Sequence, residues 1–175
     1  MKPEEFLPRA LVAALKANHV FPEMAACEAA LESGWGTSKL ARMGNNLFGQ
    51  KYSKNLTYPT IDIPTKEFEN GKWVAIRSCL WPVFPDWETC FIERMKLLRR
   101  NPRYAEALNA KNEDEYIEKV SKVWATDPDR AKSVAKMDHK YESLMIRKTQ
   151  AKFLVPTIDE AIASIPIPEL PEELK

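Results

Sequence analysis

Apolar residues recur every three to four positions along most of this chain, and they alternate in a single internal stretch. The first spacing is typical of helices with one buried face, and the second of half-buried strands. The alternating stretch, residues 57–80, contains Asn70-Gly71, a dipeptide that strongly favours a hairpin turn. We therefore predict a mainly α domain of the α+β class, with a small β-hairpin lobe inserted into a helical body. The predicted helices cover residues 6–17, 22–33, 38–43, 85–99, 104–109, 113–124 and 126–146.

The composition changes near the C-terminus. Prolines occur at positions 156, 166, 168 and 171. From Asp159 onward the chain has five acidic residues and a single basic residue, Lys175. We therefore expect one domain over residues 1–152 and a Pro-rich, acidic tail over residues 153–175, with one short helix at 159–164. The length of 175 residues fits a single well-cored domain.

Several classes of protein are disfavoured by what the chain lacks. It has no phosphate-binding glycine loop, and no dense basic stripe of the kind that binds nucleic acid. We therefore expect no binding of nucleic acid. The chain also has no run of roughly 18 apolar residues, so we expect no insertion into a membrane. His19 and His139 stand alone, and the three cysteines show no metal-binding spacing, so we expect no metal and no cofactor. We expect the cysteines to be reduced core residues.

The first residues, MKPEE, have neither the basic nor the apolar segment of a secretory signal. We therefore expect a protein made in the cytoplasm without a signal peptide. We also expect a monomer.

Glu32 is the strongest candidate for chemistry. It follows an Ala-Ala-Leu run at the end of a predicted helix and precedes the glycine-bracketed aromatic turn Gly34-Trp35-Gly36. An apolar setting raises the pKa of a carboxyl group, so that it still carries a proton near neutral pH. We expect a sheltered Glu32 carboxyl that acts as a general acid. The two glycines supply backbone freedom for the turn.

A second carboxylate is predicted on the lobe. Glu67 lies on the first strand of the hairpin, just before its turn, and Glu69 shares its face. Cleaving a glycosidic bond requires a proton for the leaving oxygen and a second carboxylate or base on the opposite face of the sugar. A helix end and a facing lobe are able to bracket a polysaccharide in this way. The aromatic residues expected to stack on sugars are Trp35, Phe48, Trp73 and Trp81.

Five short motifs follow one another within residues 20–145. They are residues 29–36 (AALESGWG), 44–51 (GNNLFGQK), 66–73 (KEFENGKW), 101–104 (NPRY) and 124–128 (WATDP). In this order they resemble the N-acetylglucosaminidase domain of glycoside hydrolase family 73, which includes bacterial autolysins, flagellar peptidoglycan hydrolases and phage lysins.

The resemblance implies a lysozyme-like helical fold with a β-lobe over the cleft. It also implies hydrolysis of the β-1,4 bond on the reducing side of N-acetylglucosamine in peptidoglycan. Glu32 matches the general acid of the family and Glu67 the lobe carboxylate. Attack by the 2-acetamido group of the substrate is an alternative to a second protein carboxylate. The residues expected to bind substrate are Trp35, Asn46, Phe48, Phe68, Trp73, Trp124 and Asp127.

Three positions depart from the usual pattern. Trp124 and Phe68 stand where the family commonly has Tyr, which removes a hydroxyl near each carboxylate. Glu28 stands where the family often has Gln, and we expect it to raise the pKa of Glu32 if both face the cleft. Asp127 has a second interpretation as a helix N-cap, and the loop at Asn46 a second interpretation as a capped turn.

These observations predict an endo-β-N-acetylglucosaminidase that binds peptidoglycan glycan strands. The expected context is a phage or prophage lysin, released through a membrane-permeabilising, holin-type partner. The alternatives are a lysozyme-like muramidase, a lytic transglycosylase, and a non-catalytic cell-wall-binding module.

Overall fold

The computed structural model describes residues 1–69, 72–76, 78–125 and 127–145. Residues 1–145 form one compact unit. The predicted tail with its short helix, and the predicted domain boundary at residue 152, lie outside the described residues.

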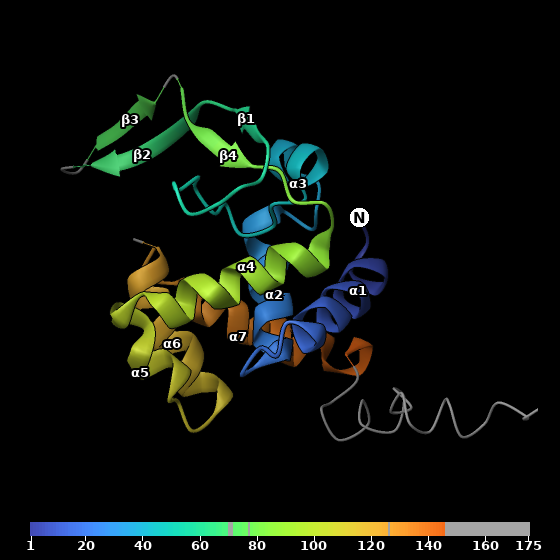
Figure 1. Ribbon diagram of the computed structural model, residues 1–175. Coiled ribbons are helices and arrows are strands. Elements are labelled where there is room, and N and C mark those ends of the chain that lie inside the picture. Colours follow the sequence, from blue (N-terminus) through green and yellow to red (C-terminus); the bar gives the residue numbers. More distant parts are fainter. Residues whose placement is uncertain (70–71, 77, 126, 146–175) are drawn as a thin grey trace, which may run out of the picture. The chain divides into compact units, whose positions relative to one another are not determined.

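Helices make up most of this unit (Figure 1). They follow the predicted periodicity closely, and polar caps begin three of them: Ser38, Asp86 and Asn112 each accept a hydrogen bond from a backbone N–H three residues on. The α-helices are α1 (Pro3–Lys16), α2 (Pro22–Ser33), α3 (Lys39–Gly44), α4 (Trp87–Arg100), α5 (Ala105–Leu108), α6 (Glu113–Trp124) and α7 (Arg130–Tyr141), with 3-10 turns at Pro102–Tyr104 and Glu142–Leu144.

Helix α2 lies at the centre of the helical body. It packs against α1 and α7, and α1 in turn packs against α4. Every residue from Met24 to Ala30 is buried, so α2 has no solvent-facing stripe along that length. Four of these residues are alanines, whose small side chains let neighbouring helices approach closely. The helix therefore holds whatever chemistry lies at its C-terminal end in a fixed position.

The end of α2 is a left-handed turn. Gly34, Trp35 and Gly36 all have positive φ angles, of 57°, 59° and 70°. The N–H of Trp35 donates to the carbonyl of Ala30 at 2.8 Å, which closes the helix end. A Cβ at position 36 would approach the Phe6 ring to 3.2 Å, so the predicted backbone role of these glycines is confirmed.

The β-lobe contains four short strands where the sequence predicts one hairpin. They are β1 (Thr60–Asp62), β2 (Thr65–Glu69), β3 (Lys72–Ile76) and β4 (Leu80–Pro82). Strands β2 and β3 form the predicted antiparallel pair, with Glu67 opposite Val74 and Phe68 opposite Trp73, while β1 pairs with β4. The prediction of two strands was therefore incomplete. The predicted turn at Asn70-Gly71 lies outside the described residues.

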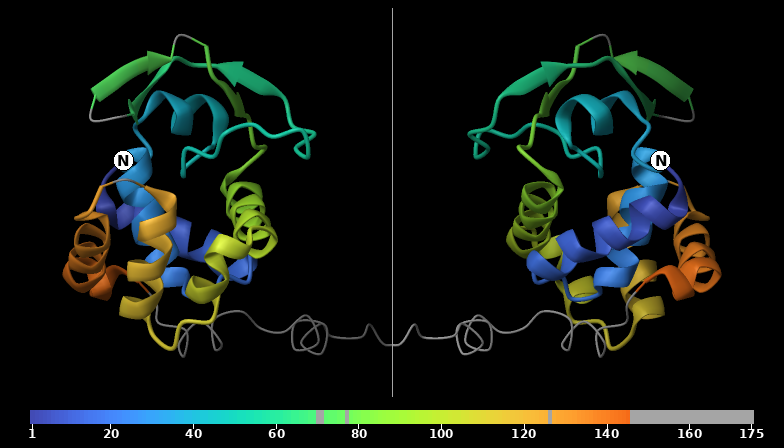
Figure 2. Two further views of the ribbon diagram at one scale, coloured as in Figure 1. Left: turned by 90° about the vertical axis from the view of Figure 1, so that its left-hand side faces the viewer. Right: turned by 90° about the vertical axis from the view of Figure 1, so that its right-hand side faces the viewer.

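Strands β1 and β4 join the lobe to the helical body (Figure 2). Trp81 on β4 is buried, and its indole N–H donates to the carbonyl of Ile63 at 2.9 Å. The amide of Asn45, just after α3, donates to the carbonyl of Phe84 at 2.9 Å. The ring of Tyr58 packs edge-on against Phe84, with centroids 5.3 Å apart. Trp81 is therefore part of this joint, and the expectation that it stacks on sugar is not supported.

The last predicted helix begins later than expected. It was predicted from residue 126, whereas α7 begins at Arg130. Asp127 Oδ1 accepts a hydrogen bond from the backbone N–H of Asp129 at 2.9 Å, so it closes a turn before the helix. Among the described residues, no helix is long and apolar enough to cross a membrane.

Two of the three cysteines behave as the sequence predicts. Cys27 and Cys90 are buried in the core. Burial raises the pKa of the Cys90 thiol to about 12, so it stays protonated and unreactive. Cys79, which was expected in the core, is only partly buried.

Candidate active site

Glu32 occupies the last turn of α2, next to the left-handed turn. Its side chain is 25% exposed, and its Oε1 accepts a hydrogen bond from Nε of Arg130 at 2.7 Å. Arg130 is the first residue of α7 and its side chain is 2% exposed. The carboxylate of Glu32 is therefore held on one side by a buried guanidinium and is open to solvent on another.

The expected burial of Glu32 is wrong. The residue lies at the exposed end of an otherwise buried helix, where Leu31 is also exposed. Its hydrogen-bond partner is the guanidinium of Arg130, so the apolar shelter predicted for this carboxyl group is absent. An apolar Ala-Ala-Leu run does not determine whether the residue that follows it is buried.

Glu28, one turn earlier, is the carboxylate that is fully buried. Its Oε1 accepts from Nη2 of Arg94 at 2.6 Å and from Nη2 of Arg130 at 2.9 Å, and its Oε2 accepts from the hydroxyl of Tyr116 at 3.1 Å. Burial alone would raise the pKa of this carboxyl group, but the charges of Arg94 and Arg130 outweigh it and lower the pKa. Glu28 does not face a cleft beside Glu32, so the arrangement of two carboxylates in one cleft is not present.

Arg94 links this charge cluster to the aromatic residues. Its guanidinium carbon lies over the rings of both Phe48 and Trp124, 4.2 Å and 4.1 Å from their centroids. Contact with two aromatic rings is a favourable setting for a buried guanidinium, whose planar ion is weakly hydrated. The pKa of Arg94 is raised: burial opposes the charge, but Glu28 more than compensates.

The structure corrects two of the substrate-binding predictions, those for Phe48 and Asn46. Phe48 is 1% exposed and packs on Arg94 and Phe91, so its ring is not available to a sugar. Asn46 is also 1% exposed; its side chain donates to and accepts from the backbone of Gln50 and closes the loop. Trp35 packs edge-on against Phe6 and Tyr141 but is partly exposed, so its predicted role in substrate binding stays a prediction.

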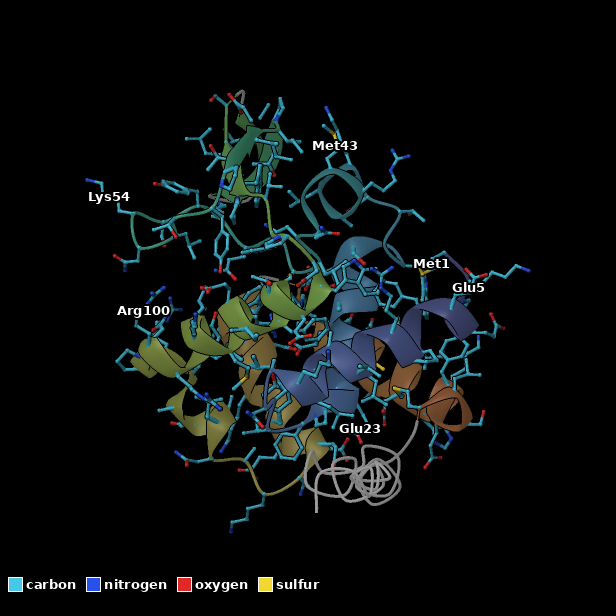
Figure 3. All side chains as sticks on the ribbon, turned by 45° about the vertical axis from the view of Figure 1, so that its right-hand side comes forward. Met1, Glu5, Glu23, Met43, Lys54 and Arg100 are labelled. Carbon is cyan, nitrogen blue, oxygen red and sulfur yellow. The ribbon has the colours of Figure 1, made fainter. Side chains whose placement is uncertain are left out.

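The role of Trp124 in substrate binding stays a prediction. It is partly exposed and lines an open groove of about 630 Å³ together with Tyr104, Lys51 and Arg100. The other lining residues are Gly49, Leu97, Asn101 and Pro102. Figure 3 shows Arg100 at the C-terminal end of α4, and Lys54 extending from the loop before β1. The groove therefore combines an aromatic wall with a basic rim.

Asp127 lies apart from this groove. It is exposed and lines a separate hollow of about 410 Å³ with Ser121, Ala125 and Pro128. Its side chain closes the turn before α7, as expected of a residue that ties a loop, while the N-cap of α7 is Asp129 and not Asp127.

Three predicted residues lie on the outer strands. Glu67 and Phe68 belong to β2, and Trp73 belongs to β3. The placement of their side chains lies outside what the structure describes, as does that of Glu69, so their roles stay predictions.

The sequence analysis missed Arg94, Tyr116 and Arg130. Arg94 lies three residues after Phe91 and four before Leu98, on the buried stripe of α4. A charge at such a position predicts a buried counter-charge, and Glu28 lies within the similarly apolar stretch of α2. This signal was present in the sequence. Within the described part of the chain, no group of His, Cys, Asp and Glu residues is arranged to hold a metal ion.

The chain is similar to known proteins over most of its length. Residues 9–143 match the glucosaminidase family, described as mannosyl-glycoprotein endo-β-N-acetylglucosaminidase. The peptidoglycan hydrolase FlgJ of Escherichia coli K12 is 33% identical over 122 residues, 67% of this chain and 39% of its own length. The exo-glucosaminidase LytG of Bacillus subtilis is 32% identical over 131 residues, 71% of this chain and 45% of its own.

A solved structure gives the same result. The C-terminally truncated glycoside hydrolase domain of Salmonella typhimurium FlgJ superposes with a TM-score of 0.65 and 27% identity, covering 81% of this chain and 99% of that one. This chain spans about two fifths of the length of the curated FlgJ relatives. The lysozyme-like, mainly α fold predicted from the motifs is confirmed. With a family match over residues 9–143, the chain belongs to the glucosaminidase family, glycoside hydrolase family 73.

Proposed function

We propose that this chain hydrolyses peptidoglycan as an endo-β-N-acetylglucosaminidase. It cuts the β-1,4 bond between N-acetylglucosamine and N-acetylmuramic acid, with Glu32 as the general acid. The family match supports the reaction class, and relatives named as a peptidoglycan hydrolase and a glucosaminidase support the substrate.

The single observation that carries the assignment is the setting of the Glu32 carboxylate. A general acid has to reach the leaving oxygen and keep one orientation while it does so. Glu32 meets both conditions, because it is partly exposed at the end of a buried helix and one of its oxygens is bound by Arg130. Glu28, which is fully buried and bound on both oxygens, keeps one orientation but cannot reach a substrate.

The groove at Trp124 is the proposed path of the glycan. Sugar rings bind well against the flat face of an aromatic ring, and Trp124 is held rigidly because its other contacts are with Arg94, Phe48 and Tyr104. The rim cations Lys51 and Arg100 attract the anionic wall polymer. The expectation of Trp124 as a substrate-binding residue is thereby kept as part of the proposal.

Two routes complete the reaction after Glu32 protonates the leaving oxygen. In one, a lobe carboxylate, Glu67 or Glu69, activates water on the opposite face of the sugar. In the other, the 2-acetamido group of the substrate attacks the anomeric carbon and water later opens the resulting ring. The position of Glu67 on β2, opposite Val74, is compatible with the first route.

Digestion of purified sacculi, followed by borohydride reduction and mass spectrometry of the fragments, tests the proposal. We expect fragments that end in reduced N-acetylglucosamine. Reduced muramic acid would show a muramidase instead, and a 1,6-anhydro end would show a lytic transglycosylase. Binding to sacculi without any cleavage would show a non-catalytic wall-binding module.

Two variants anchor this experiment to the site. Glu32→Gln keeps the shape of the side chain and removes the proton donor, so we expect cleavage to fall by about 10²- to 10⁴-fold. Glu88→Gln is the matched control, since Glu88 is also a partly exposed helix glutamate bound to a cation, Lys16. We expect Glu88→Gln to cleave at the wild-type rate.

We also propose, from the sequence expectations alone, that the protein acts as a phage or prophage lysin that crosses the membrane with a holin-type partner and works as a monomer. Expression in the bacterial cytoplasm tests this context. We expect lysis only when a membrane-permeabilising protein is produced with it, and export of the chain without such a protein would contradict the proposal.

A further inference from the structure

Arg130 contacts both glutamates of α2 and one residue of α6. Its Nε donates to Glu32 at 2.7 Å, its Nη2 to Glu28 at 2.9 Å, and its Nη1 to the hydroxyl of Ser121 at 2.8 Å. All three guanidinium nitrogens are therefore engaged, each with a different residue. A planar guanidinium bound in this way has one position and one orientation.

We propose that Arg130 is a positioning residue that holds the Glu32 carboxylate in its reactive orientation, and that the buried charge of Glu28 holds Arg130 in place. This inference rests on the proposed function of Glu32 as the general acid. Arg130 acts through Glu32 and does not need to touch the sugar.

The geometry separates the two oxygens of Glu32. Oε1 is bound by Arg130, and within the described residues no hydrogen bond to Oε2 is present. Oε2 is therefore the oxygen from which the proton passes to the glycosidic oxygen as the C–O bond breaks. Arg130 leaves that oxygen free to meet the substrate and restrains rotation of the carboxylate about its terminal bond.

Glu28 supplies the counter-charge that allows Arg130 to be buried. Two guanidinium groups, those of Arg94 and Arg130, share its Oε1, while Tyr116 donates to its Oε2. A buried cation is tolerated only with a close counter-charge. The negative charge of Glu28 is therefore required here. In this chain a Gln would leave two buried cations near a single carboxylate, that of Glu32.

The groups that face Arg130 come from several elements. Glu28 and Glu32 lie on α2, Arg94 on α4, and Tyr116 and Ser121 on α6. Tyr104 and His19 lie close enough to influence the cluster electrostatically. Together with Arg130 itself, the cluster holds two Arg cations and two carboxylates, so loss of the charge of Arg130 would unbalance it.

Steady-state kinetics on soluble glycan strands test the inference. Arg130→Lys keeps the positive charge and loses the planar, three-way contact. We expect kcat to fall by about 10- to 100-fold while KM changes by less than about threefold, because the lost interaction serves the acid and not the bound sugar. In the Glu32→Gln background the same change should lower kcat by less than about twofold, since a residue that acts through Glu32 has nothing left to position.

Two further variants keep the test decisive. Tyr58→Phe removes a hydrogen bond from a tyrosine to a glutamate, Glu93, outside the Arg130 cluster, so it controls for the loss of such a bond alone, and we expect kcat within about twofold of wild type. Ser121→Ala removes only the bond to Nη1; if Arg130→Lys does not fold, a fall in kcat of about threefold in Ser121→Ala at constant KM supports the inference.

The outcomes separate this inference from the proposed function. Absence of cleavage by the wild type would remove both. An active wild type with an unchanged kcat in Arg130→Lys and Ser121→Ala would overturn the positioning role alone. An equal fall of kcat in Arg130→Lys, with and without Glu32, would assign Arg130 a purely structural role and would also overturn it.

Discussion

The two ends of one helical turn in α2 have opposite surroundings. At Glu28 the carboxylate is closed in by Arg94, Arg130 and Tyr116 and has no contact with solvent. At Glu32 the carboxylate has one buried partner and a side chain that is 25% exposed. The same residue type therefore serves two purposes four positions apart: the first holds the interior together, and the second is available to a substrate. Arg130 is the residue that both share.

Burial and access to solvent are therefore divided between these two residues. Under the proposed function, a carboxyl group that gives a proton to an incoming substrate requires access, and a fully buried one has none. The interior cluster supplies rigidity that an exposed side chain lacks.

Removing each carboxylate should have very different effects on stability. Glu28→Ala leaves two buried cations without their shared counter-charge, so we expect a loss of about 3–5 kcal/mol in the free energy of unfolding. Glu32→Ala removes a partly exposed pair, and we expect a loss below about 1 kcal/mol. Urea denaturation followed by circular dichroism measures both. Similar losses in the two variants would contradict the division between interior and exposed carboxylate.

The interior carboxylate should also determine how stability depends on acid. The pKa of Glu28 is lower in the folded state than its ordinary value of about 4.3. The stabilisation of the folded state by ionised Glu28 is therefore complete above that ordinary value, and it is lost as the pH falls through the lower pKa of the folded state. We expect the difference in unfolding free energy between wild type and Glu28→Gln to be constant near pH 6–7 and to shrink below about pH 4. A difference that grows as the pH falls would contradict the lowered pKa.

Trp124 connects the interior cluster to the groove, so its removal should affect both. In Trp124→Ala, Arg94 loses one of its two aromatic contacts, and we expect the free energy of unfolding to fall by about 1–2 kcal/mol. We also expect KM for glycan strands to rise by about tenfold. Trp124→Phe keeps an aromatic face and should change KM by less than about threefold. An unchanged KM in Trp124→Ala would exclude this groove from substrate binding.

The smallest effect is expected far from this cluster, where the lobe meets the helical body. The hydroxyl of Tyr58 donates to Glu93 at 3.1 Å, and Glu93 also binds Lys96. Because Lys96 still satisfies the carboxylate in Tyr58→Phe, we expect a loss below about 1 kcal/mol and an unchanged KM. A rise in KM would show that the joint of the lobe also shapes the binding site.

Much of the fold could be predicted from the sequence because its local signals agree with its packing. Helical periodicity, the caps at Asp86 and Asn112, and the glycines after Glu32 each have one structural solution, which the chain adopts. Strands β1 and β4 were missed because each is three residues long and gains its pairing only from the other, across the whole lobe. A local sequence pattern does not predict a pairing between such distant segments.

The site was less predictable for a related reason. The position of Glu32 at a helix end follows from local sequence, but its burial depends on what packs around that end. As single aromatic residues, Phe48 and Trp35 were both predicted to stack on sugars. Only the tertiary contacts show that the ring of Phe48 packs on Arg94 and that of Trp35 on Phe6 and Tyr141. Charges at core positions of the helical pattern, such as Arg94, were the signal that would have revealed the cluster.

The most direct test of the central claim compares two substrates that differ only in the leaving group. A glycosidic bond to a sugar hydroxyl needs a proton from the acid, whereas an aryl β-glycoside of an N-acetylglucosamine oligosaccharide with a strongly acidic phenol departs without one. We predict that Glu32→Gln lowers kcat by about 10²-fold or more on the natural glycan and by less than about tenfold on the aryl glycoside. An equally large loss on both substrates would contradict Glu32 as the general acid.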